Sequence, residues 1–119
     1  MVDTLRPLHD RVTAPASLPI PSHPDVATWR PATAADVDGI WRLTQAMDEA
    51  DHPNYLATRD EVAEEFGFSH FHAELDSIVG LNAEGAIVAN GMVILPPGQE
   101  TLVRSVLFGG VHPELRGRG

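Results

Sequence analysis

Three runs of β-forming residues near the carboxyl end constrain the fold more than any other feature of this sequence. They read DSIVGLN (76–82), AIVANGMVILPP (86–97) and TLVRSVLFGGVHP (101–113). Only the short turns AEG and PPGQ separate them, and Gly85 in the first turn can take the positive φ that a hairpin requires. Runs joined this closely predict a meander of three antiparallel strands.

A strand and a helix are predicted well before the meander. The stretch ATWRPAT (27–33) favours a short strand that ends near Pro31, after which Thr33 or Asp36 can cap a helix. In ADVDGIWRLTQAMDEA (35–50) the apolar residues recur every three or four positions. One face of this helix should therefore meet a core.

A second helix is predicted in TRDEVAEEFGF, where Thr58 and Glu61 have the spacing of a capping box. It should end near Gly67, and Glu61, Glu64 and Glu65 are interpreted as a solvated face. The resulting order is strand, helix, helix and three strands. This order predicts an α+β domain with a mixed, largely antiparallel sheet.

Residues 1–27 differ from the rest of the chain. They hold five prolines and show little apolar periodicity. This pattern predicts an extended or disordered lead-in that carries no chemistry and could dock on a partner domain. The folded domain is expected to comprise residues 28–119.

Composition excludes several classes of function. The chain has no cysteine, so it can form no disulfide, thiol nucleophile or cysteine-ligated metal centre. Its formal net charge of −9 argues against nucleic-acid binding, because a phosphate backbone repels an acidic surface. No apolar run approaches the roughly 20 residues that span a bilayer, and the start lacks a signal-peptide pattern. We therefore expect a cytoplasmic location and no membrane partner.

The strongest candidate binding site lies at the end of the sequence. All eight basic residues are arginines, whose planar donor fork suits anionic oxygens, and two of them lie in RGRG (116–119). Adjacent Gly109 and Gly110 in the last strand indicate a β-bulge or the close approach of a ligand to the backbone. The glycine-flexible amides of RGRG can form a nest for a pyrophosphate. The alternative is a basic, glycine-rich terminal tail.

The strand, the double glycine, the proline and the Arg-Gly string together resemble the GNAT superfamily of N-acetyltransferases. The acyl-CoA motif of that family commonly reads V-x-P-x-x-R-G-x-G after a strand, and the matching residues here are Val111, Pro113, Arg116, Gly117 and Gly119. WRPATAADVDGIWRL is also similar to the family's opening strand and first helix. The resemblance runs from Trp29 to Gly119 and implies the amino-terminal half of the fold, ending inside the acyl-CoA-binding motif.

The resemblance implies roles for six residues. Backbone groups around Gly110 and Val111 would align the pantetheine arm of acetyl-CoA and polarise its thioester carbonyl. The amides of Gly117, Arg118 and Gly119 would cradle the pyrophosphate, and Arg116 and Arg118 would add positive charge. The implied reaction is direct attack of an amine acceptor on acetyl-CoA, which serves as co-substrate.

The resemblance assigns no catalytic residue. Some family members carry a glutamate base six residues before the valine of the motif, where this chain has Ser105. A water relay, a residue beyond 119 and a catalytically silent domain are the alternatives, and the fragment is not expected to be active alone. The alternative function is a non-catalytic GNAT-like module that binds acyl-CoA or packs against a partner domain in a tandem protein. An unrelated interaction domain ranks last.

The last predicted strand also has consequences for partners. Its apolar residues would form an open edge, and they are Val103, Val106, Leu107 and Phe108. We expect this edge to pair with the missing half of the fold, a second GNAT domain or another copy of the chain.

Two weaker signals complete the sequence reading. The acids from Asp48 to Asp51 could line a cleft for a cationic amine, although a solvated helix face explains them as well. His70 and His72 could present two imidazoles on one face of a strand, but no third ligand has diagnostic spacing. No metal is therefore expected.

Overall fold

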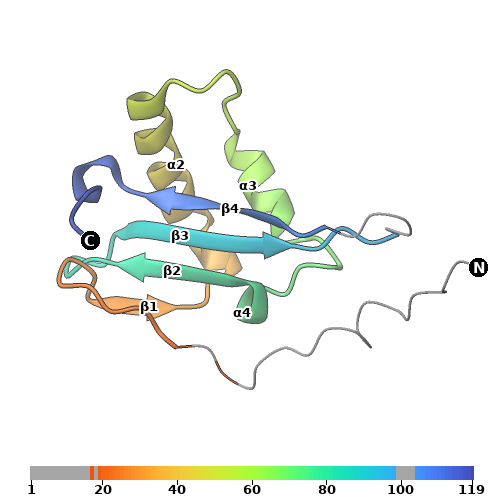
Figure 1. Cartoon of the computed structure of the whole chain (residues 1–119). Helices are drawn as coiled ribbons and strands as arrows, with labels where there is room; N and C mark the ends of the chain where they lie inside the picture. Colours follow the sequence, from red (N-terminus) through yellow and green to blue (C-terminus); the bar gives the residue numbers. More distant parts are fainter. Residues whose placement is uncertain (1–16, 18, 99–103) are drawn as a thin grey trace, which may run out of the picture.

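The computed structural model describes residues 17, 19–98 and 104–119. Its four strands are β1 (Thr28–Arg30), β2 (Ser77–Leu81), β3 (Ile87–Ile94) and β4 (Val106–Val111). They form one sheet in the order β1-β2-β3-β4, and each neighbouring pair is antiparallel (Figure 1). The predicted α+β class and the predicted meander are confirmed.

Two longer helices lie on one face of this sheet. A 3₁₀ turn, η1 (Ala34–Asp36), leads into α2 (Val37–Asp51), which contacts β3 and β4, and α3 (Arg59–Glu65) packs beside α2. Residues from the two helices, the inner strands and two loops form the buried core: Ala32, Val37, Ile40, Val62, Phe71, Val79, Met92 and Ile94. Within the described residues, no helix is both long and apolar enough to span a lipid bilayer.

The predicted capping box at the start of α3 is confirmed. The Glu61 amide donates to Thr58 Oγ1 at 3.2 Å, and the Thr58 amide donates back to the Glu61 carboxylate at 3.4 Å. At the carboxyl end of α2, His52 takes a left-handed conformation with φ of 50°, and its amide donates to the Asp48 carbonyl. Both helix ends are thus fixed by local hydrogen bonds.

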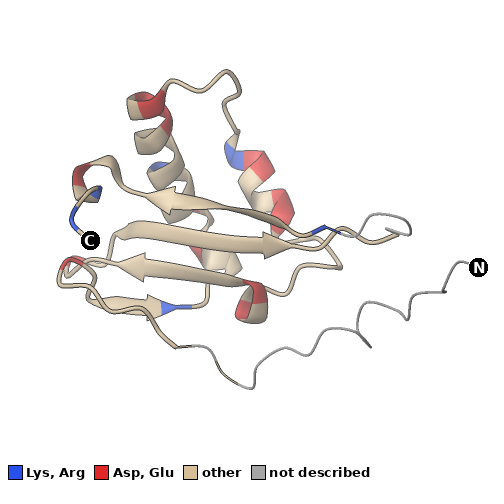
Figure 2. Ribbon diagram, in the orientation of Figure 1, with Lys and Arg blue, Asp and Glu red and all other residues tan. Residues whose placement is uncertain are grey.

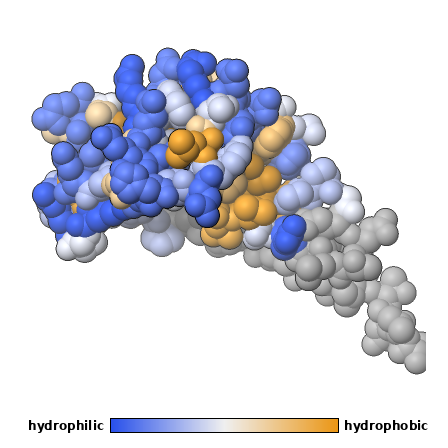
Figure 3. Space-filling model, turned by 90° about the horizontal axis from the view of Figure 1, so that it is seen from above, coloured by the Kyte–Doolittle hydropathy of each residue, from blue (hydrophilic) through white to orange (hydrophobic). Residues whose placement is uncertain are grey.

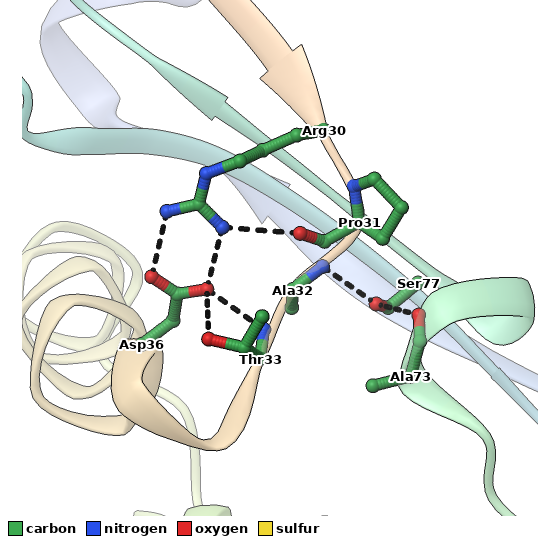
Figure 4. A network of polar contacts seen from close by, with 7 residues as sticks. All are labelled: Arg30, Pro31, Ala32, Thr33, Asp36, Ala73 and Ser77. Atoms are coloured by element: carbon green, nitrogen blue, oxygen red, sulfur yellow. Dashed lines mark hydrogen bonds and ion pairs between the residues drawn. The ribbon is translucent and has the colours of Figure 1, made fainter.

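A polar network joins the first helix to the sheet, as Figure 4 shows. Arg30 at the end of β1 makes two hydrogen bonds to the Asp36 carboxylate, of 2.7 and 2.9 Å, and the Thr33 amide donates to the same carboxylate. Nearby, the Ala32 amide donates to Ser77 Oγ at 2.9 Å, and Ser77 Oγ donates to the Ala73 carbonyl. The network connects residues 30–36 with residues 73–77, two segments that are distant in the sequence.

Ala73 belongs to a helix that the sequence analysis did not predict. α4 (Ala73–Asp76) is a single turn directly before β2. Its first amides are satisfied locally, because the Asp76 carboxylate accepts from the His72 amide at 2.9 Å. The two histidines of the HFH stretch therefore lie in the segment that leads into α4, and the predicted strand there is wrong.

The double glycine of β4 is explained by packing inside the protein. The β3–β4 register runs without interruption from Ala89↔Val111 to Ile94↔Val106, so the predicted bulge is wrong, and the irregularity lies at Gly80/Leu81 in β2. Gly109 has φ of 144°, and a Cβ there would collide with the Asn90 carbonyl. A Cβ at Gly110 would collide with the sulfur of Met47 on α2. Neither glycine needs a ligand to account for it.

Charge and apolar surface are separated on this fold. Figure 2 shows carboxylates concentrated on the helices, whereas the sheet carries little charge and two arginines lie in the carboxyl-terminal loop. The open edge of β4 is apolar, with Leu107 73% exposed and Val106 and Phe108 partly exposed. Figure 3, which looks down on the molecule from the β4 side, shows apolar side chains gathered in one patch. Val103, the fourth predicted edge residue, lies outside the described residues.

Candidate cofactor site

The open edge of β4 exposes alternate main-chain groups. β4 is the last strand of the sheet, and the His112 amide donates to the Val88 carbonyl at 2.8 Å. Because hydrogen-bonded and non-hydrogen-bonded pairs alternate in an antiparallel ladder, Gly110 faces Asn90 of β3 with its amide and carbonyl. The main-chain groups of Gly109 and Val111 therefore face away from the sheet, toward the open edge.

The chain turns sharply after β4. Pro113–Leu115 form a 3₁₀ turn, η2, whose first amides are held by His112: Nδ1 accepts from the Glu114 amide and the carbonyl accepts from the Leu115 amide. Beyond it, Gly117 and Gly119 have positive φ angles of 77° and 92°. A residue with a side chain adopts such angles at a cost, so glycine is suited to both positions.

The last three amides lie in the loop beyond η2. Among the residues that the structure describes, the amides of Gly117, Arg118 and Gly119 donate no hydrogen bond. They follow a turn whose own amides are paired, so the loop is neither continued helix nor strand. Unpaired amides of this kind are one requirement of an anion nest, and the bound anion itself remains a prediction.

Arg116 is held inward. Its Nη1 and Nη2 donate to the two carboxylate oxygens of Asp51 at 2.6 and 2.9 Å, and its Nε donates to the Val111 carbonyl at 3.1 Å. The hydrogen bonds from Arg116 hold the pKa of Asp51 below its ordinary value. All three nitrogens of the guanidinium therefore have partners within the protein.

Arg118 is held more loosely and by a different segment. Its Nη1 lies 3.6 Å from Asp25 Oδ2, while His23 Nε2 lies 2.9 Å from the Arg118 carbonyl. His23 Nδ1 accepts from the Asp25 amide at 3.1 Å, so the ring proton must be on Nε2, which donates to the carbonyl. Part of the predicted lead-in thus lies against the carboxyl-terminal loop (Figure 1).

A pocket of about 400 Å³ lies between these two segments. One wall is formed by Trp29 and by Ala89 and Val111, which are neighbours across β3 and β4. His23 and Arg118 are at its rim. The Trp29 Nε1 proton is buried and has no hydrogen-bond partner in the described part of the chain.

The other candidate residues lie away from this pocket. Ser105 directly precedes β4, and His70 stacks on Phe68 with ring centroids 5.1 Å apart. No cluster of three metal-ligating side chains occurs among residues 19–98 and 104–119. Asp48 and Glu49 line a separate open hollow beside Trp41.

Two predicted surface acids have specific surroundings. Asp51 is tied to Arg116, a pairing across 65 residues that no local sequence pattern indicates. Glu65 is partly buried, and the loss of hydration raises the pKa of its carboxyl. For Glu65 the predicted solvated face is therefore wrong.

Comparison with solved structures supports a relationship. The fold is similar to the crystal structure of a GCN5-related N-acetyltransferase from Sphaerobacter thermophilus, with 26% identity and a TM-score of 0.60 over 76% of this chain. Two mutants of the BH1408 protein from Bacillus halodurans match at 16% and 15% identity, with TM-scores of 0.46 and 0.44, each over 76% of this chain. No protein-family model matches, and no curated protein sequence matches significantly.

The extent of these matches is partial. This chain spans 27% of the length of the Sphaerobacter protein and 65% and 64% of the two BH1408 chains. The predicted resemblance is confirmed: the chain has the fold of the GCN5-related N-acetyltransferase superfamily.

Proposed function

We propose that this chain provides the acyl-CoA-binding part of an N-acetyltransferase, which moves acetyl from acetyl-CoA to an amine. The observation that carries the proposal is that the amides of Gly117, Arg118 and Gly119, just beyond β4 and η2, have no hydrogen-bond partner among the described residues. Backbone amides in a glycine-rich loop bind phosphate oxygens with both hydrogen bonds and partial positive charge. The diphosphate of coenzyme A is the matching ligand.

The open edge of β4 would hold the rest of the cofactor. The Val111 amide and the Gly109 main-chain groups face this edge, whereas the Val111 carbonyl already accepts from Arg116. The pantetheine arm contains amides that can pair with such an edge, as an added strand would. In the reaction, an edge amide would donate to the thioester oxygen, where negative charge develops. Gly110 contributes by letting Met47 pack close behind the strand.

The chemical step needs a neutral amine. The amine nitrogen attacks the thioester carbonyl carbon, the carbon–sulfur bond breaks, and coenzyme A leaves as the thiolate, which takes up a proton. The proton lost from the amine must pass to a base, because an amine with a pKa of about 10.4 is protonated at neutral pH. Ser105 is not a base, so this proton passes to a water relay or to a group outside this chain.

Ser105 also favours a second candidate function, a non-catalytic module that binds acyl-CoA or packs against a second domain. The apolar edge of β4 fits such packing, whether against the remainder of the fold, a second GNAT domain or another copy. A cytoplasmic location stays part of the proposal. Turnover of acetyl-CoA with a panel of amines, measured on a protein that joins this chain to the remainder of the fold, separates the two functions, because only the first predicts release of free thiol.

The proposal is tested by calorimetric titration of the chain with acetyl-CoA. We expect saturable binding that Arg118→Ala weakens about fivefold to tenfold, because a charge-assisted contact to a phosphate is lost. Arg59→Ala is the matched control, since Arg59 pairs with Asp38 on the helical side and should leave the affinity unchanged. Absence of binding by the unaltered chain, or equal losses in both variants, would contradict the proposal.

A further inference from the structure

Two carboxylates hold the two arginines of the carboxyl-terminal loop, and they do so in different ways. Asp51 binds Arg116 through two short hydrogen bonds in a fork-to-fork pair. Asp25 approaches Arg118 through one longer contact of 3.6 Å. A bidentate pair fixes the orientation of both partners, whereas a single long contact fixes neither.

The Arg116 pair joins the helical layer to the loop. Asp51 is the last residue of α2, and the left-handed residue after it, His52, ends the helix at a defined point. Arg116 stands between the 3₁₀ turn and Gly117, and its Nε also holds the Val111 carbonyl at the end of β4. One guanidinium thus links α2, β4 and the first residue of the glycine loop.

The use of all three guanidinium nitrogens changes the expected role of Arg116. These bonds use three of the five guanidinium N–H donors, and the Asp51 carboxylate balances the charge of the side chain, so Arg116 offers a diphosphate less than a loosely held arginine does. Arg118, by contrast, keeps an exposed guanidinium with one loose partner. Of the two arginines, Arg118 is therefore the one placed to contact an anion, and Arg116 is placed to hold the loop.

We infer that Asp51 is a positioning residue, which acts through Arg116 to hold the amides of Gly117 and Gly119 in their anion-binding geometry, whereas Asp25 competes with the anion for Arg118. The inference rests on the proposed function, because it assigns roles at the same acyl-CoA site. It gives the two carboxylates opposite effects on the affinity for the cofactor.

Simple electrostatics makes a different prediction. Coenzyme A is strongly anionic, so removal of any nearby negative charge should strengthen its binding. If Asp51 acts only through its charge, Asp51→Asn will bind the cofactor more tightly. If it positions the loop, Asp51→Asn will bind more weakly, although a repulsive charge has gone.

The experiment is calorimetric titration of coenzyme A into the whole chain and three variants, at low and at physiological salt. We expect Asp51→Asn to bind about fivefold to tenfold more weakly at both salt concentrations, because a fixed geometry is lost. Asp51→Glu should recover part of this loss, since a carboxylate is restored. Asp25→Asn should bind about twofold to fivefold more tightly at low salt, with a smaller gain at higher salt.

A second measurement separates positioning from general unfolding. Asp51→Asn should have the same midpoint of thermal unfolding as the unaltered chain and the same amide hydrogen exchange in β2 and β3. The Arg116 Nε proton, by contrast, should lose its protection from exchange. Equal or tighter binding of coenzyme A by Asp51→Asn would overturn the inference and leave the proposed function intact. Failure of the unaltered chain to bind coenzyme A would instead overturn the proposed function itself.

Discussion

At the scale of single residues, glycines in β4 carry constraints that a sequence pattern shows only in part. The pattern GG indicated a special backbone position, and this was correct for Gly109, whose φ of 144° no side-chain residue adopts readily. The interpretation as a bulge was wrong, because the neighbour that excludes a Cβ is the Asn90 carbonyl of the adjacent strand. A sequence alone does not reveal which strand lies opposite.

The variant Gly109→Ala tests this explanation. We expect it to destabilise the fold by about 2 to 4 kcal/mol, because the new Cβ meets a backbone carbonyl at a strained φ angle. Gly91→Ala is the matched control, since Gly91 is the cross-strand partner of Gly109 and a Cβ there would lie at an ordinary 3.5 Å from Ile78. Urea unfolding of both variants measures the difference. Equal stabilities would show that Gly109 is not required by packing.

The pairing of Arg116 with Asp51 was also beyond sequence reasoning. The two residues are 65 positions apart, and nothing local marks Asp51 among the acids that surround it. The resemblance implies a charge role for Arg116 at the phosphate, and this stays a prediction; the structure adds that the guanidinium has partners within the protein. Only the placement of the α2 end beside the loop brings the two together.

At the scale of secondary-structure elements, the sequence was most informative where the signal is local. The capping box of Thr58 and Glu61 and the glycine turn at Gly85 involve neighbours in the chain, and both are confirmed. The single turn of α4 was missed because four residues carry too little periodicity to distinguish helix from loop. Its start depends on the Asp76 side chain, which also carries no diagnostic spacing.

The joint between β1, η1 and β2 makes a prediction that depends on pH. Hydrogen bonds from Arg30 hold the pKa of Asp36 below its ordinary value. Between the lowered pKa and the ordinary one, the folded state therefore binds fewer protons than the unfolded state. The stabilisation by Asp36 is therefore complete above about pH 4 and is lost as the pH falls through the lowered pKa.

Asp36→Asn should accordingly lower the free energy of unfolding by about 1 to 2 kcal/mol at neutral pH, because two charge-assisted bonds and a capping contact weaken. The difference from the unaltered chain should shrink below pH 4. Asp38→Asn is the control, since the Asp38–Arg59 pair lies on the surface and should contribute little. Chemical denaturation across this pH range measures both. A difference that grows in acid would refute the assignment.

At the scale of the whole molecule, the short turns made the order of the last three strands predictable. The position of β1 in the sheet was not predicted. β1 pairs with β2 across about fifty residues of helix and loop, and it lies at the opposite edge of the sheet from β4. The lead-in was expected to be extended or disordered and to carry no chemistry, and this stays a prediction. Two of its residues, His23 and Asp25, contact the carboxyl-terminal loop and line its pocket.

The contact between the lead-in and the loop could not be predicted for a physical reason. It depends on one histidine tautomer, one long ion pair and the shape of the pocket, none of which leaves a periodic pattern. The same reason limits the functional reading, because the motif predicts where an anion binds but not which groups already occupy its arginines.

The most direct measurement of the central claim is a titration of the ¹⁵N-labelled chain with coenzyme A, followed by amide resonances. We predict saturable shifts at the amides of Gly117, Arg118, Gly119 and Val111, with little change on α3. If coenzyme A leaves those four amides unmoved while other parts of the chain respond, the loop after β4 does not bind the diphosphate, and the account is contradicted.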